Sequence, residues 1–245
     1  MKRILLLALV VLSAAACKTI TPETRIAQIN QHFNGKEAVY SAKLPQYTDE
    51  KLLDYLTLQL AGNLGAKDIW TLEEDGHVAL VAEFPGKDKK NPQLSMISAS
   101  LADPNACATI LEVLEAYKKI NIQHKNTIRA LFYSPATDSS GKNGLSLVNQ
   151  DMRESGDMVL FDTEVATRSD QPLHTFVLEE SPAFTKTLVD VVPGYMAPLG
   201  NYQLVQGTFP NLDWQLRCPI YRYYIDPTAF QPEAAAVTAF TFLLN

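Results

Sequence analysis

The sequence predicts an α/β fold: one three-layer domain whose mixed, mostly parallel β-sheet has helices on both faces. Two observations support this class. Strand patterns alternate with amphipathic helix patterns along the chain, and a hairpin signal precedes them. In the middle of the chain a strand, a helix and a second strand follow one another with short joints, which nearly always means parallel strands and a right-handed crossover. Roughly 230 residues follow an N-terminal signal, enough for one domain with a buried core.

Two outer helices and a hairpin are expected before the crossover unit. Apolar residues recur at helical spacing over residues 24–33 and 48–64, and Gly62 and Gly65 mark the end of the second stretch. Residues 68–74 and 77–84 have strand patterns. They flank Asp75-Gly76, a two-residue hairpin signal.

The crossover unit consists of an apolar strand over residues 94–99, a helix over 107–119 that starts at Asp103-Pro104-Asn105, and a strand over 127–133. Sites on such sheets lie beyond the carboxyl ends of the parallel strands. Here the polar or small residues at those ends are Ser100, Ala102, Asp103, Thr137 and Asp138.

The rest of the chain continues the alternation of helices and strands. We expect helices over 144–150, 181–190 and 227–244, strands over 158–165 and 174–178, and a last strand entered near residues 215–217. Residues 192–200 contain two prolines and two glycines, so a loop is expected there.

The N-terminus has the pattern of an export signal. Met1-Lys2-Arg3 is basic, Ile4 to Val11 is apolar but too short for the roughly 20 residues of a spanning helix, and small residues run into Cys17. This pattern resembles the lipobox of bacterial lipoproteins, although Ala14 stands where leucine is usual. The resemblance implies cleavage after residue 16, a lipid anchor on Cys17, a tether over 17–23 and a domain over 24–245. Lys18 replaces the aspartate that commonly retains lipoproteins at the inner membrane, which favours the outer membrane of a bacterial envelope; a plain secretory signal is the alternative.

The charge and the cysteine content of the chain limit which partners and which disulfide bonds are expected. The net charge of −6 and the lack of a Lys/Arg stripe argue against a nucleic-acid partner. Two cysteines remain in the domain, Cys107 and Cys218, and an oxidising envelope permits a bond between them. Two separate buried thiols are the alternative.

The order of these parts resembles the M28 family of zinc aminopeptidases, which includes animal-type glutaminyl cyclases, over about residues 52–245. The family's strand apolar-Ser-Ala-His-x-Asp resembles Ile97-Ser98-Ala99-Ser100-Leu101-Ala102, and its Asp-Asn-Ala-Ser-Gly segment resembles Asp103-Pro104-Asn105-Ala106. Its strand with paired glutamates, its Gly-Ile-Pro turn and its Tyr-His-Thr-x-x-Asp tail resemble residues 131–138, 207–210 and 220–226. The resemblance implies the zinc exopeptidase fold, also called phosphorylase/hydrolase-like.

The same resemblance implies a site for one or two zinc ions, but most of the expected ligands are replaced. Ser100 and Ala102 stand in place of a histidine and an aspartate, whereas Asp103 keeps the position of the bridging aspartate. Thr137 and Asp138 align with the glutamate pair, Asp162 or Glu164 with the next acid, and Arg222 or a nearby tyrosine with the last histidine. Because carboxylates without imidazoles hold zinc poorly, we expect no cofactor. His32, His77, His124 and His174 do not follow the ligand order, and Asp103 before Pro104 also fits a helix N-cap.

Other enzyme classes find little support. Ser98 and Ser100 lack the Gly-x-Ser-x-Gly elbow of α/β-hydrolases. Cys107 at a helix start is a candidate low-pKa thiol, but no histidine pairs with it in the sequence pattern, which favours a buried thiol.

Aromatic residues gather near the end of the chain, where the family places its substrate pocket. We expect Trp214, Tyr221, Arg222 and Tyr223 to bind a ligand, unless they only fill the space of the lost metal. The resulting hypothesis is a lipid-anchored envelope pseudopeptidase that binds a peptide or a protein. The alternatives are a zinc aminopeptidase with a rebuilt site of Asp103, Asp138 and Asp162, and a structural subunit of an envelope complex.

Overall fold

The computed structural model describes a little more than half of the chain. The described residues are 27–28, 31–32, 39–40, 43–47, 49–89, 93–121, 124, 126–135, 139, 142–155, 159–167, 175–178, 203–206 and 220–225. The predictions for the signal, the tether, residues 181–200 and the closing helix lie outside these residues. So do Cys17, Asp138, Trp214 and Cys218.

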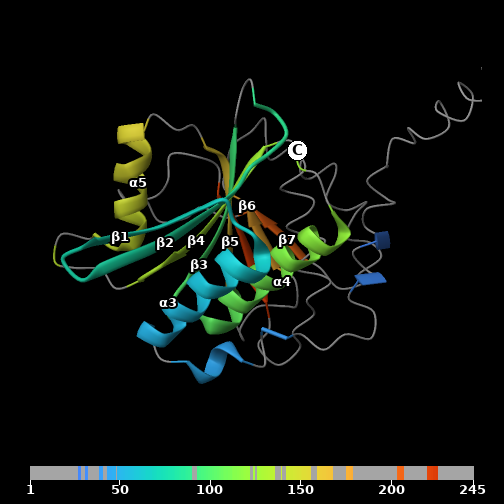
Figure 1. Cartoon of the computed structure of the whole chain (residues 1–245). Helices are drawn as coiled ribbons and strands as arrows, with labels where there is room; N and C mark the ends of the chain where they lie inside the picture. The colour runs from blue at the N-terminus through green and yellow to red at the C-terminus, as the bar shows by residue number, and fades with distance from the viewer. Residues whose placement is uncertain are drawn as a thin grey trace, which may run out of the picture.

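One mixed sheet of eight strands forms the centre of the described structure (Figure 1). Its order is β1-β2-β4-β3-β5-β8-β6-β7. The strands are β1 Asp68–Glu74, β2 His77–Phe84, β3 Leu94–Ser100, β4 Thr127–Tyr133, β5 Val159–Thr167, β6 Thr175–Leu178, β7 Gln203–Gln206 and β8 Ile220–Ile225. Strand β3 is parallel to β4 and β5, β5 to β8, and β6 to β7, while β2 runs antiparallel to β1 and β4, and β6 to β8. The predicted mixed, mostly parallel sheet is therefore confirmed.

Helices cover both faces of this sheet, as the three-layer prediction requires. Figure 1 shows α3 (Asp49–Leu58) and α4 (Pro104–Ile120) together on one face and α5 (Gly144–Ser155) on the other. A short 3-10 helix, Leu44–Gln46, lies against α4, and a π-helical turn, Gln59–Leu64, continues α3. Among the described residues, no helix has the length and apolar character needed to cross a membrane.

Each face of the sheet has its own buried core because successive strand residues point to opposite sides. On the α3/α4 face, Ile97 and Ala99 of β3 pack in one cluster with Ile110 of α4. On the α5 face, Met96 of β3 and Val148 of α5 belong to a second cluster. Strands β3 and β4 are buried on both sides, and most of their positions hold apolar or small residues.

Most of the expected elements are found, with corrections at their ends. The helix predicted over 48–64 is α3 followed by the π turn, which ends at Gly65 in the left-handed conformation with φ 76°. Helix α5 extends five residues beyond the predicted 150, because Met152 still packs on the sheet. The predicted entry of the last strand near 215–217 lies outside the described residues, which include this strand as β8 from Ile220 onward, and β7 was not predicted.

Candidate functional site

The carboxyl ends of four parallel strands meet at one edge of the sheet, which we call the carboxyl edge. Ser100 of β3 is the cross-strand partner of Tyr133 of β4, and Thr167 of β5 is the partner of Ile225 of β8. This edge is where ligands bind in open α/β sheets. The topology thus brings Ser100 and Asp103, both singled out in the sequence, to the edge where a site is expected.

Asp103 lies just beyond β3 and accepts hydrogen bonds with both carboxylate oxygens. Its Oδ1 accepts from the backbone N of Ala106 at 3.0 Å, so the predicted N-cap of α4 is confirmed. The same Oδ1 accepts from the hydroxyl of Thr167 at 2.8 Å, and Oδ2 accepts from the backbone N of Thr167 at 2.6 Å. Asp103 therefore joins the start of α4 to the end of β5.

The turn between β3 and α4 is closed by Ser100. Its Oγ accepts from the N of Ala102 at 3.1 Å, and its carbonyl oxygen accepts from the N of Asp103 at 2.9 Å and from the thiol of Cys107 at 3.3 Å. Cys107 is free and fully buried. Burial, and secondarily the charge of Asp103, raise the pKa of this thiol well above its usual range, so it is a buried thiol and not a low-pKa nucleophile.

A second acid, Glu164, lies on the α5 side of β5. The hydroxyl of Tyr133 donates to its Oε1 at 3.1 Å, which ties β4 to β5 across the intervening β3. By register, Glu164 is the Cα partner of Ser98 on β3 and of Arg222 on β8. The predicted ligand-binding residues Tyr221 and Tyr223 are likewise partners of Thr163 and Val165, so β8 places all three between β5 and β6.

The loop after β4 returns closely to the sheet before α5 starts. The Oγ of Ser134 accepts from the N of Val78 at 2.9 Å, and the N of Gly144 donates to the carbonyl of Ser134 at 3.1 Å. A Cβ at Gly144 would lie 2.3 Å from the oxygen of Val78, so only glycine permits this approach. Asn143 caps α5 through its Oδ1, which accepts from the N of Leu145 at 3.0 Å.

Zinc is the metal that the family resemblance implies, and the described donors do not fit it. The Oδ1 of Asp103 already accepts two hydrogen bonds and its Oδ2 one, while Ala102 offers no donor atom. Within the described residues, no three His, Cys, Asp or Glu side chains lie close enough to hold a metal ion. Asp162 lies five residues before Thr167 on β5, about 16 Å along the strand, so the register separates it from Asp103.

Two of the described histidines, His77 and His124, lie at opposite edges of the sheet. His77 starts β2 and is buried, and the register of Ala79 with Tyr133 places it near the carboxyl edge. His124 precedes β4 and therefore lies at the opposite edge. The end of the strand predicted over 127–133 puts Tyr133 at this edge, whereas the approach of His77 and Thr167 follows only from the pairing of β2 with β4 and from the observed end of β5.

This arrangement of strands and helices is similar to that of several solved structures. No family model matches the chain, and no curated protein matches its sequence. Solved structures do match: a candidate Zn-dependent exopeptidase from Bacteroides vulgatus has a TM-score of 0.58 at 14% identity, covering 92% of this chain and 96% of its own. The chain has a zinc exopeptidase-like α/β fold.

Two further solved structures are similar to this chain. The LapA aminopeptidase of Legionella pneumophila matches with a TM-score of 0.58 at 13% identity, over 94% of this chain and 74% of its own. A glutaminyl cyclase of Porphyromonas gingivalis matches with a TM-score of 0.57 at 11% identity, over 91% of this chain and 96% of its own. At such identities the matches establish the zinc exopeptidase-like fold and not an activity.

Proposed function

We propose that this protein is a lipid-anchored component of the bacterial cell envelope that binds a peptide or another protein without hydrolysing it. The observation that carries the proposal is that both carboxylate oxygens of Asp103 accept hydrogen bonds from other residues of the domain. In the M28 resemblance this residue holds the position of the metal-bridging aspartate. Here its carboxylate accepts three hydrogen bonds, two of them from Thr167, and serves to connect α4 with β5.

The energetics of these bonds support a structural role for Asp103. Hydrogen bonds to charged groups contribute about 1.5–3 kcal/mol each. A metal at Oδ1 would have to displace the amide of Ala106 and the hydroxyl of Thr167 and would gain no imidazole in return. Ser100, in place of the first histidine, uses its Oγ to accept from the backbone of its own turn.

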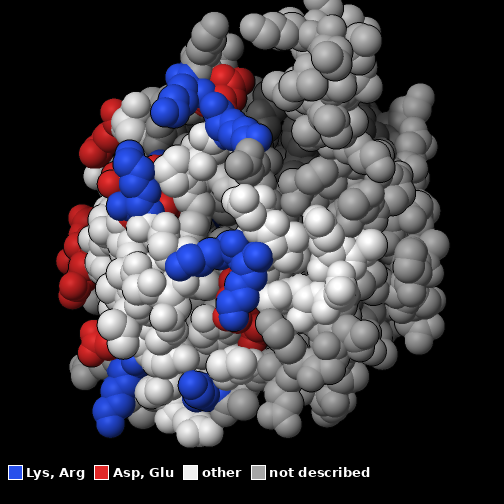
Figure 2. All heavy atoms as spheres, turned by 45° about the vertical axis from the view of Figure 1, so that its right-hand side comes forward, with Lys and Arg blue, Asp and Glu red and all other residues white. Residues whose placement is uncertain are grey.

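The binding role rests on β8 and the carboxyl edge. Strand β8 places Tyr221, Arg222 and Tyr223 between β5 and β6, next to Glu164, and Trp214 precedes this strand in the sequence. Aromatic groups and arginine are the residue types that dominate protein recognition surfaces. On the face shown in Figure 2, lysine and arginine side chains are interspersed with carboxylates, which favours a peptide or protein over a nucleic acid.

The membrane partner follows from the N-terminal signal. A lipid on Cys17 followed by the short tether of residues 17–23 would hold the domain close to the membrane surface, with the outer membrane favoured by Lys18. Labelling with radioactive palmitate in a bacterial host tests this part: the wild-type chain is expected to incorporate label and Cys17→Ser to lose it. Label retained by Cys17→Ser would contradict the anchor.

Site-specific cross-linking tests the binding role. A photoreactive amino acid at Tyr223 is expected to capture a peptide or protein in intact cells, whereas the same group at the exposed Thr71 of edge strand β1 is expected to capture none. Hydrolysis of leucine p-nitroanilide in the presence of zinc is expected to stay at the buffer rate. Equal capture at the two positions, or hydrolysis that Asp103→Asn abolishes, would contradict the proposal.

A further inference from the structure

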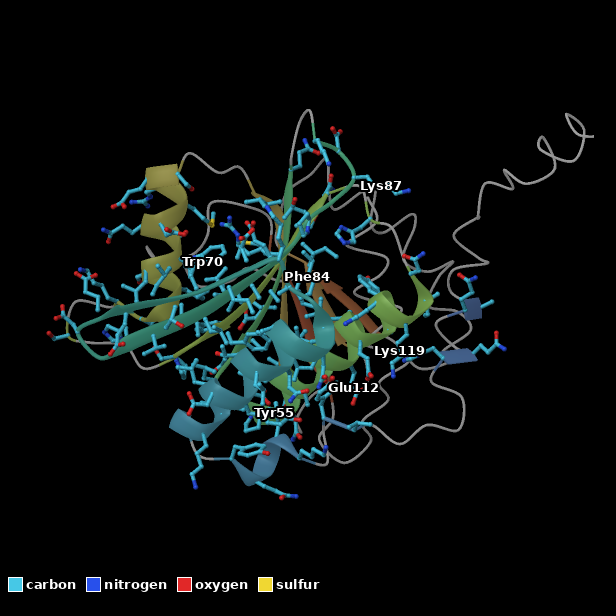
Figure 3. The ribbon with its side chains drawn as sticks, viewed as in Figure 1. Tyr55, Trp70, Phe84, Lys87, Glu112 and Lys119 are labelled. Atoms are coloured by element: carbon cyan, nitrogen blue, oxygen red, sulfur yellow. The ribbon has the colours of Figure 1, made fainter. Side chains whose placement is uncertain are left out.

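A cavity of about 200 Å³ opens at the end of the sheet opposite to Asp103, and we call it the amino-edge cavity. It lies where β2 ends and β4 begins, since Phe84 and Ile128 are cross-strand partners, and where α4 ends. Figure 3 labels Phe84 at the centre of the view, where the strands converge, and Lys119 on α4 to its lower right. The M28 resemblance assigns no role to this edge.

Apolar side chains of the main core form one part of the wall of the amino-edge cavity, and Lys118, Asn121 and His124 form the other part. Leu64, Leu114 and Ile128 are buried members of the α3/α4 cluster, and Phe84 packs against it. Pockets for drug-sized ligands measure roughly 300–1,000 Å³. A smaller cavity of this kind suits a single apolar side chain.

Lys118 places a positive charge at the cavity. Its Nζ donates to the carbonyl of Asn63 at 2.6 Å, which leaves donors for a further partner. Within the described part of the chain no carboxylate pairs with Lys118, whereas the next residue, Lys119, pairs with Glu115 at 2.8 Å. Asn63 belongs to the π turn, a rare conformation that is frequent at functional sites.

His124 also lines this cavity. Its Nδ1 lies 2.5 Å from the carbonyl oxygen of Asn126, and because a carbonyl only accepts, Nδ1 carries the proton. Burial lowers the pKa of His124, so the ring is neutral near pH 7. In this tautomer Nε2 is an acceptor and calls for an N–H donor from a ligand.

We propose that the amino-edge cavity binds the C-terminal apolar residue of a peptide. The terminal carboxylate pairs with Lys118, the amide N–H of the same residue donates to Nε2 of His124, and the side chain fills the space between Phe84, Leu114 and Ile128. A carboxylate, an adjacent N–H and an apolar group match the three kinds of surface that meet there. The site stands whether or not the carboxyl edge binds a partner, because the two lie at opposite ends of the sheet.

Calorimetric titration of the chain from Lys18 onward with N-acetyl-Ala-Ala-Leu tests this proposal. Saturable binding is expected. The same peptide with an amidated C-terminus is expected to bind at least about tenfold more weakly, because it loses the charge-assisted pair with Lys118. Hexanoate, which has a carboxylate and an apolar chain but no N–H, is expected to bind more weakly than the peptide acid. N-acetyl-leucine has the carboxylate, the N–H and the apolar side chain, so it can make all three contacts.

Two neighbouring lysines offer a matched pair of variants. Lys118→Met is expected to weaken binding of the peptide acid by at least about tenfold. Lys119→Met removes the same charge one position further along α4, from a side chain paired with Glu115, and is expected to leave binding unchanged. Urea unfolding of both variants verifies that they are folded. No saturable binding by the wild type, equal affinity for acid and amide, equal affinity for hexanoate, or equal effects of the two substitutions would each overturn the proposal.

Discussion

Asp103 and Thr167 are 64 positions apart in the chain and are joined by two hydrogen bonds, at 2.6 Å from the backbone N and at 2.8 Å from the hydroxyl of Thr167. This pair fixes the turn after β3 against the end of β5. In a zinc exopeptidase-like fold these two positions border the edge where the M28 resemblance expects a metal. Asp103 links two secondary-structure elements at this edge.

Removal of this link is expected to destabilise the domain measurably. Thr167→Val keeps the backbone donor but loses the hydroxyl, so the free energy of unfolding is expected to fall by about 1–3 kcal/mol. Urea unfolding followed by circular dichroism measures the change. Thr71→Val, at an exposed position of edge strand β1, is the control and is expected to change stability by less than about 0.5 kcal/mol. Equal effects at both positions would show that the link contributes nothing.

Local patterns predicted some elements to the residue, and the reason is visible at the hairpin. Asp75 and Gly76 have φ angles of 51° and 79°, the left-handed values that a two-residue hairpin turn requires, so this signal fixed the ends of β1 and β2. Strand β7 has only four residues, of which Leu204 and Val205 are apolar, too short for a periodic pattern. The position of β8 between β5 and β6 is a tertiary property that no local pattern contains.

The candidate site shows the same division between local and tertiary information. The cap that Asp103 gives to α4 is local and was predicted from Asp103-Pro104. Its bonds to Thr167, and the bond from Tyr133 to Glu164, depend on the strand order β4-β3-β5 and could not be read from spacing. The rebuilt metal site was expected to include Asp162, and the register of β5 instead places that residue far from Asp103.

The close approach at the start of α5 predicts a strong effect of a single methyl group. In Gly144→Ala the new Cβ would meet the oxygen of Val78 at 2.3 Å, so the backbone must shift, and we expect a loss of about 1–3 kcal/mol or more. Gly62→Ala is the matched control. It lies in the π turn with nothing within 4 Å of the new Cβ and is expected to be neutral or to stabilise by up to about 1 kcal/mol. Thermal unfolding of both variants measures the two changes in stability. Comparable losses of stability in Gly144→Ala and Gly62→Ala would contradict the packing argument.

The ion pair between Arg129 and Glu83 lies on the α5 face. It predicts that the loss of a buried charge destabilises the fold much more than the loss of a surface charge. The Nε and Nη2 of Arg129 donate to Glu83 at 3.0 and 2.5 Å, and the guanidinium lies 5.2 Å from the ring centroid of Trp70. Only 6% of the Arg129 side chain is exposed, so Glu83→Gln removes the carboxylate charge that compensates a buried guanidinium and is expected to cost about 3 kcal/mol or more. Glu115→Gln breaks the surface pair with Lys119 and is expected to cost about 0.5 kcal/mol. Urea unfolding at pH 7 compares them, and a Glu83→Gln loss as small as that of Glu115→Gln would contradict this account.

His124 predicts a pH dependence of stability with a definite sign. Burial lowers its pKa from the ordinary value of 6.5, so below that pH the unfolded chain takes up a proton that the folded chain resists. The stabilising contribution of the neutral ring is present above pH 6.5 and is lost as the pH falls through the lower pKa of the folded state. Relative to His124→Gln, the wild type is expected to lose more stability between pH 7.5 and pH 5. Parallel pH profiles of unfolding free energy would contradict the burial of a neutral ring.

The zinc content of the chain from Lys18 onward, measured by mass spectrometry after loading with zinc and desalting, tests the central claim most directly. The account predicts almost no bound zinc, because Asp103 is engaged by Ala106 and Thr167 and the first histidine position is Ser100. About one or two zinc ions per chain, lost in Asp103→Asn, would contradict it and would assign this edge of the sheet to metal-dependent chemistry.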